Sequence, residues 1–112
     1  MDKYCIINAD DYGSFLGANL ATQELLELGA ISSSTIMTPC AWAKHACKWA
    51  SEHPQHAIGV HLTFTSEWNA VRWSPVSPNG TDSLRDDEGY FWHTSEQFEE
   101  HADSGEVERE IY

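Results

Sequence analysis

Basic residues are scarce in this 112-residue sequence, where six lysines and arginines stand against eighteen aspartates and glutamates and the formal net charge is -12. Nucleic acid and anionic membrane surfaces carry charge of the same sign, so we expect neither as a partner. The segment from residue 82 to residue 112 holds eleven of the eighteen acidic residues. We expect this acidic C-terminal segment to be solvated.

Long apolar runs and cysteine are also scarce. No apolar run approaches the roughly 20 residues that cross a bilayer, and no basic segment followed by an apolar one resembles a secretory signal. The three cysteines, Cys5, Cys40 and Cys47, contain no CxxC pair. An odd number of cysteines without the spacing of metal ligands favours free thiols. We expect Cys5 and Cys47 to be buried. These features predict a reducing, cytoplasmic location.

Three common catalytic motifs are missing as well. The sequence has no GxSxG, no P-loop and no GxGxxG. It therefore gives no support to a serine hydrolase, a nucleoside triphosphatase or a dinucleotide-binding enzyme.

What the first half contains is an alternation of strand and helix patterns. Strands are expected at Tyr4–Ala9, Ile31–Met37 and Ala57–Thr63, with apolar helical stripes from residue 15 to 28 and from residue 43 to 50. The strand spacing of about 25 residues predicts parallel strands joined by helical crossovers. Because the first strand is continuously apolar, we expect it to be buried on both faces.

The second half begins with a long loop, residues 65 to 92, that is rich in aromatic side chains. These are Trp68, Trp73, Tyr90, Phe91 and Trp92. Two interpretations stay open: the loop forms one side of a substrate site, or it packs around a small core of its own. His93 follows the aromatic cluster and is a candidate for lining a pocket.

Two short helices are expected after this loop. Thr94 and Gln97 have the spacing of a capping box, which predicts a helix that reaches about His101 and is closed by Gly105. A further helix is expected from Glu106 onward.

Three parallel strands leave two open sheet edges, and two helices cover only part of the sheet. We therefore expect residues 1–112 to form a single incomplete α/β domain, the opening of a larger sheet or barrel. We also expect the isolated chain to self-associate through its open edges or to be only marginally stable.

The candidate chemistry lies at the strand ends. Asp10 and Asp11 follow the first apolar run, and His61 lies near the carboxyl end of the third strand. Parallel strands would bring the three side chains to the same edge, where carboxylate and imidazole are suitable ligands for a divalent cation. Two structural alternatives without a metal stay open: one of the aspartates caps the next helix, and His61 is a core histidine that is hydrogen-bonded to the backbone.

Several segments carry a resemblance to a known family. Residues 6–13 (IINADDYG), 33–35 (SST) and 59–63 (GVHLT) resemble the YdjC/ChbG-like carbohydrate deacetylases. Residues 87–91 (DEGYF) and 106–111 (EVEREI) also resemble that family's pattern, so the similarity extends along nearly the whole chain.

The resemblance implies an α/β fold, the N-terminal portion of a deformed (β/α) barrel of polysaccharide-deacetylase type with about three β/α units. It implies a magnesium or zinc ion and hydrolysis of N-acetyl groups on amino sugars or chitooligosaccharides. By matching position, Asp10 would be the general base, and Asp11 and His61 would be two metal ligands. The family's third ligand, a further histidine, has no counterpart here, so we expect the chain to be inactive alone.

Two rival functions stay open. The chain could be a non-catalytic α/β module that binds a carbohydrate or another partner. Alternatively, it could belong to a metal amidohydrolase that acts on another substrate.

Overall fold

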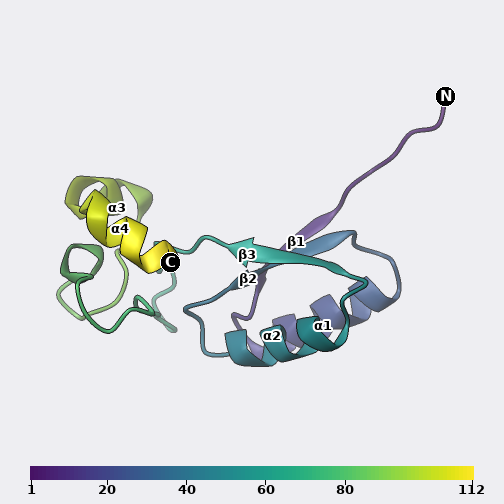
Figure 1. The fold of residues 1–112 in the computed structure, drawn as a ribbon, viewed down its shortest axis with the longest axis horizontal. Coiled ribbons are helices and arrows are strands. Elements are labelled where there is room, and N and C mark those ends of the chain that lie inside the picture. Colours follow the sequence, from purple (N-terminus) through teal and green to yellow (C-terminus); the bar gives the residue numbers. More distant parts are fainter. The chain divides into compact units, whose positions relative to one another are not determined.

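The computed structural model describes residues 1–112 and divides into two compact units, Met1–His61 and Leu62–Tyr112 (Figure 1). The N-terminal unit contains strands β1 (Asn8–Tyr12), β2 (Ser33–Met37) and β3 (Ala57–His61) and helices α1 (Leu16–Glu27) and α2 (Ala43–Glu52). The strands form one parallel sheet in the order β1-β2-β3. The expected alternation of parallel strands and helices is therefore confirmed.

Local signals in the sequence explain where these helices stop. Gly29 follows α1 with a φ of 67°, a conformation that glycine adopts without a steric penalty, and its N–H donates to the Leu26 carbonyl at 3.1 Å. Helix α2 ends at Glu52, two residues before Pro54. A residue that precedes proline is disfavoured in the helical conformation, so the helix cannot continue through His53.

The core of the N-terminal unit is small and lies between the sheet and the helices, which cover one face of the sheet in Figure 1. Its buried side chains are Tyr12, Ile36, Ala43 and Ala46, and Trp49, Ala50 and Ile58 pack against them. The alanines let α2 approach the sheet closely. No helix in either unit is long and apolar enough to cross a membrane.

The expectation that Tyr4–Ala9 is a strand buried on both faces is wrong. Tyr4 and Ile6 are 91% and 83% exposed, and β1 begins only at Asn8, which pairs with Ser33. The apolar run lies mostly before the paired part of the strand, and the helices of this unit cover only one sheet face (Figure 1). The run therefore lacks a covering layer within this unit.

The expected burial of Cys5 and Cys47 is also wrong. Cys5 and Cys47 are exposed, whereas Cys40 is buried. Cys5 belongs to the exposed run that precedes β1, and the buried positions of α2 are limited to Ala43 and Ala46. The face of α2 that is buried against the rest of the unit is thus narrower than its apolar pattern indicates, and Cys47 does not belong to it.

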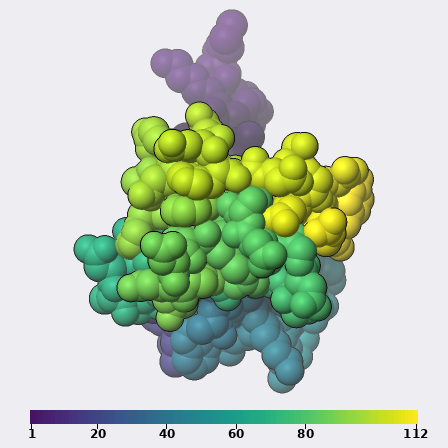
Figure 2. Space-filling view, turned by 90° about the vertical axis from the view of Figure 1, so that its left-hand side faces the viewer, coloured from purple at the N-terminus to yellow at the C-terminus, as the bar shows by residue number.

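The C-terminal unit contains a short 3₁₀ helix, η1 (Asp82–Leu84), and helices α3 (Ser95–His101) and α4 (Ser104–Ile111). Its atoms, green to yellow in Figure 2, form a continuous surface. Leu84 and Phe91 are completely buried and Trp73 is 5% exposed, so the long aromatic loop has a core of its own.

The capping box of α3 is confirmed: Thr94 accepts from the Gln97 N–H, and the Gln97 side chain accepts from the Thr94 N–H. The expectation that Gly105 closes this helix is wrong, because α3 ends at His101 and Gly105 lies in the first turn of α4. The Asp103 carboxylate accepts from the Gly105 N–H and starts α4 two residues earlier than expected.

The acidic C-terminal segment is not simply solvated. Glu106 accepts the Ser83 backbone N–H at 2.8 Å, and Glu110 accepts the N–H groups of Val76 and Ser77 at 2.6 and 3.0 Å. Hydrogen bonds from the Ser83 side chain and backbone lower the pKa of Glu106. These two carboxylates of α4 therefore satisfy backbone donors of the preceding loop.

Candidate functional site

The first strand changes its geometry at Asp11. Successive side chains of a regular strand point to opposite faces, but β1 has an irregular register between Ala9 and Tyr12, and Asp11 adopts a φ of 61°. A positive φ is uncommon for a residue other than glycine, although aspartate tolerates it better than most. This local distortion reorients the Asp11 side chain relative to a regular strand.

The distortion brings Asp11 to His61, across the middle strand of the sheet. The distance between Asp11 Oδ1 and His61 Nδ1 is 3.5 Å, and the Asp11 backbone N–H donates to the same ring nitrogen at 3.4 Å. The two side chains are partly solvent-exposed, 49% for Asp11 and 31% for His61. Residues fifty positions apart in the sequence thus meet near the carboxyl ends of β1 and β3.

Asp10 precedes Asp11 in β1, and its side chain is oriented by two neighbours. Asn8 Nδ2 donates to Asp10 Oδ1 at 2.6 Å, and Thr35 Oγ1 donates to the same oxygen at 3.3 Å. Thr35 is in β2, where it pairs with Gly59 of β3. Both of these bonds go to one carboxylate oxygen, so the other oxygen of Asp10 accepts neither of them.

The Asp11–His61 pair has the donor types and the spacing of two ligands of one cation. Ligands at about 2.1 Å from a tetrahedral zinc ion lie about 3.4 Å from each other, close to the 3.5 Å between Asp11 Oδ1 and His61 Nδ1. No group of three or more cysteine, histidine or acidic side chains in the chain has the arrangement of a metal site. The donor set that these residues offer is therefore partial.

A second polar arrangement lies in the C-terminal unit around Arg72, whose side chain is only 8% exposed. Its guanidinium contacts Asp86 Oδ2 and His93 Nε2, each at 2.7 Å, and donates to the Phe91 carbonyl at 2.8 Å. Its Nε donates to Ser66 Oγ at 3.1 Å. We call these contacts the Arg72 network.

Hydrogen bonds from Arg72 and from the backbone favour the ionised form of the Asp86 carboxyl. Burial alone would raise the pKa of Asp86, but hydrogen bonds from Arg72 and from the backbone N–H groups of Tyr90 and Glu88 outweigh burial and lower it. Asp86 and Arg72 therefore form a charged pair with little exposed surface.

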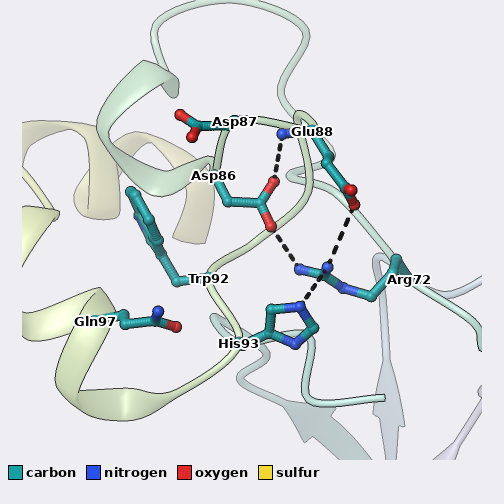
Figure 3. A pocket seen from close by; sticks show the side chains of 7 residues that line it. All are labelled: Arg72, Asp86, Asp87, Glu88, Trp92, His93 and Gln97. Atoms are coloured by element: carbon teal, nitrogen blue, oxygen red, sulfur yellow. Dashed lines mark hydrogen bonds and ion pairs between the residues drawn. The ribbon is translucent and has the colours of Figure 1, made fainter. Parts of the chain in front are cut away.

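The Arg72 network borders a pocket of about 300 Å³, shown in Figure 3. Arg72, Asp86 and His93 line it, together with Asp87, Glu88, Trp92 and Gln97. The expectation that His93 lines a pocket is confirmed. Sequence reasoning missed Arg72, because an isolated arginine in an irregular loop has no spacing pattern; its only signal was the scarcity of basic residues among so many acidic ones.

Several proteins named as deacetylases are similar to this chain in sequence. Carbohydrate deacetylases from Brevibacillus brevis and Thermus thermophilus are each 37% identical to it over 109 residues, covering 95% and 97% of this chain but 40% and 36% of the relatives. A chitooligosaccharide deacetylase from Yersinia enterocolitica is 37% identical over 65 residues, 58% of this chain and 26% of that protein. The chain thus spans well under half the length of these relatives.

A solved structure has the same fold over most of this chain. It is the crystal structure of a candidate cellobiose-phosphate cleavage protein from Enterococcus faecalis, which aligns with a TM-score of 0.73 and 35% identity. The alignment covers 94% of this chain and 39% of that protein. The family model described as YdjC-like protein matches residues 4–112, and the chain therefore belongs to the YdjC-like protein family.

Proposed function

We propose that this chain provides the water-activating part of a metal-dependent carbohydrate deacetylase, which removes N-acetyl groups from amino sugars or chitooligosaccharides. The observation that carries the proposal is the 3.5 Å approach of Asp11 to His61 near the strand ends, and Asp10 precedes Asp11 in β1. Relatives with 37% identity that are named carbohydrate deacetylases support the choice of reaction.

In this proposal Asp11 and His61 hold a divalent cation, magnesium or zinc. When bound, such a cation polarises an amide carbonyl and lowers the pKa of its water. The oriented carboxylate of Asp10 accepts a proton from the attacking water, since the hydrogen bonds from Asn8 and Thr35 both go to its other oxygen. The water oxygen bonds to the acyl carbon and the amide C–N bond breaks. The proton held by Asp10 passes to the departing nitrogen, which leaves acetate and a free amine on the sugar.

Calorimetric titration of the chain with zinc chloride and with magnesium chloride tests the metal part of this proposal. We expect Asp11→Ala and His61→Ala each to weaken uptake of the preferred ion by at least about tenfold, since even the loss of residues that only orient ligands costs about 10–100-fold. His56→Ala is the matched control and should bind like the parent. Equal affinities of the parent and both site variants would contradict the proposal and favour a non-catalytic module.

The chain alone should not release acetate from an N-acetylated chitooligosaccharide. Catalytic zinc sites usually have three protein ligands, and we assign only two here. Acetate release that stops on addition of a chelator would show that these two ligands are sufficient. Acetate is quantified enzymatically, with Asp10→Asn as the control that lacks the proposed base.

A further inference from the structure

The four asparagines of this chain lie in different environments. Asn19 is fully buried, and its amide group is hydrogen-bonded at both its oxygen and its nitrogen. Asn8 lies in β1, where its amide nitrogen donates at 2.6 Å and its oxygen accepts at 2.7 Å. Asn69 and Asn79 are exposed residues of the long loop, and neither side chain makes a hydrogen bond. These two side chains are therefore the ones that are free to change conformation.

Asn79 differs from Asn69 in the residue that follows it. Gly80 follows Asn79, whereas Ala70 follows Asn69. The main-chain nitrogen of the following residue is the nucleophile that attacks the carbonyl carbon of an asparagine side chain, and glycine has no Cβ next to that nitrogen. The Gly80 N–H donates no hydrogen bond in the structure. The nitrogen of Gly80 is therefore neither shielded by a side chain nor engaged in the backbone.

The fold requires glycine at this position. Gly80 has a φ of 69°, a conformation that other residues adopt only with strain. A Cβ at this position would also overlap the guanidinium of Arg109. The backbone of the turn thus excludes the larger residues that would protect Asn79.

Two arginines of the C-terminal unit hold the turn that contains this pair. Arg109 Nη1, in α4, donates to the Gly80 carbonyl at 2.6 Å, and Arg85 Nη2 donates to the Ser77 carbonyl at 3.2 Å. The next residue, Thr81, is 1% exposed. A change in the backbone at residue 79 would therefore act on the contact between the turn and α4.

We propose that Asn79–Gly80 is a site of spontaneous deamidation, at which water converts residue 79 into aspartate or isoaspartate. The Gly80 nitrogen bonds to Asn79 Cγ and loses its proton, the Cγ–Nδ2 bond breaks, and Nδ2 leaves with that proton as ammonia. Water then opens the cyclic imide. Cleavage of the bond between the Gly80 nitrogen and Cγ gives aspartate, and cleavage of its bond to the main-chain carbonyl carbon gives isoaspartate.

The two products affect the turn differently. Aspartate keeps the length of the main chain and adds a negative charge next to the residue whose carbonyl binds Arg109. Isoaspartate adds a carbon atom to the main chain and so displaces the Gly80 carbonyl from Arg109. We expect only isoaspartate to weaken the contact of α4 with the turn.

Incubation of the full chain in mildly alkaline buffer tests the proposal, because trypsin places Asn69 and Asn79 in separate peptides, residues 49–72 and 73–85. Mass spectrometry follows the replacement of NH2 by OH. We expect Asn79 to convert at least about tenfold faster than Asn69, a barrier about 1.4 kcal/mol lower. Conversion of Asn79 no faster than that of Asn69, or strongly slowed relative to the chain unfolded in guanidinium chloride, would overturn the proposal.

Variants confirm the site and its effect. Asn79→Gln should leave peptide 73–85 unmodified, because the longer side chain would have to form a larger ring; continued modification of this peptide would contradict the assignment. Asn79→Asp reproduces one product, so α4 should exchange its amide hydrogens as in the parent. The more acidic fraction of an aged sample, isolated by ion exchange, should contain isoaspartate by enzymatic methylation and exchange faster at residues 104–111. Equal exchange in this fraction and in Asn79→Asp would contradict the effect on α4.

Discussion

Asn19 is a fully buried polar residue that ties three segments of the N-terminal unit together. Its Oδ1 accepts the Gly13 N–H at 2.7 Å, and its Nδ2 donates to the Trp42 carbonyl at 3.1 Å. Gly13 has a φ of 95° directly after the Asp10–Tyr12 segment, so Asn19 fixes the turn that ends β1. The candidate site therefore depends on a residue that lies in α1 and touches none of its three side chains.

We predict that Asn19→Ala destabilises the chain by roughly 1–3 kcal/mol, because it leaves the buried Gly13 N–H without a partner and removes one of the two hydrogen bonds to the Trp42 carbonyl. Urea unfolding followed by circular dichroism measures the change. Ser51→Ala, which removes an exposed side-chain hydrogen bond, is the control and should have little effect. If Asn19→Ala lowers the free energy of unfolding by no more than the control does, water takes over the hydrogen bonds of the Asn19 side chain.

Asp86 makes the stability of the chain depend on pH. Its pKa is lowered in the folded state, so its stabilising contribution is present above the unfolded pKa of about 3.9 and disappears as pH falls through the lower folded value. We predict that Asp86→Asn costs roughly 1.5–3 kcal/mol at pH 6 and flattens the loss of stability below about pH 4. Urea unfolding at several pH values, followed by tryptophan fluorescence, tests this, with Asp82→Asn as control.

At the scale of single elements, α3 is the clearest case of a helix specified by its cap. It has only seven residues and no buried side chain, so packing alone does not explain where it begins. The reciprocal bonds between Thr94 and Gln97, both 3.2 Å, satisfy two backbone N–H groups at its start.

We predict that Thr94→Ala lowers the free energy of unfolding by about 1 kcal/mol, whereas Thr94→Ser, which keeps the hydroxyl, has a much smaller effect. Backbone amide hydrogen exchange of residues 95–101 should accelerate in the alanine variant only. Equal exchange in the two variants would show that contacts outside the cap hold the helix.

The sequence could predict the elements that are specified by local signals, but not those whose burial depends on distant parts of the chain. Helices α1, α2 and α3 and the parallel order of the strands follow from periodicity and from local signals such as Gly29, Pro54 and the Thr94 cap. The start of β1 could not be predicted. An apolar run indicates that its side chains favour burial, but it does not show which of its residues pair with a neighbouring strand, and the two helices of this unit cover only one sheet face. Burial on a strand depends on neighbours that the local sequence does not encode.

The candidate site was predicted only in part, because some of its features leave no pattern in the sequence. The position of Asp10, Asp11 and His61 near the strand ends follows from parallel pairing, which spacing can indicate. The positive φ of Asp11 and the irregular register of β1 are backbone features without a pattern in composition or periodicity. The Arg72 network was not predicted at all, because its partners are separated by up to 21 residues in an irregular loop.

For the molecule as a whole, each unit has its own buried residues, but apolar surface is distributed unevenly between them. In the N-terminal unit β1 and β3 are both edge strands, and Val60 of β3 is 64% exposed. Leu20, Ile6 and Ile7 add exposed apolar side chains in this unit. An open edge with unpaired backbone groups and exposed apolar side chains can pair with a second chain.

We predict that the chain associates with itself in a concentration-dependent manner through the β3 edge, and that Val60→Lys shifts it toward the monomer, because a charged side chain on an edge strand opposes pairing. Val76→Lys is the matched control: Val76 is 62% exposed but lies in a loop of the C-terminal unit, so its replacement should leave association unchanged. Sedimentation velocity over a hundredfold concentration range measures both variants against the parent. A parent that sediments as a monomer at every concentration would contradict the prediction, and an equal response of the two variants would place the contact elsewhere than at β3.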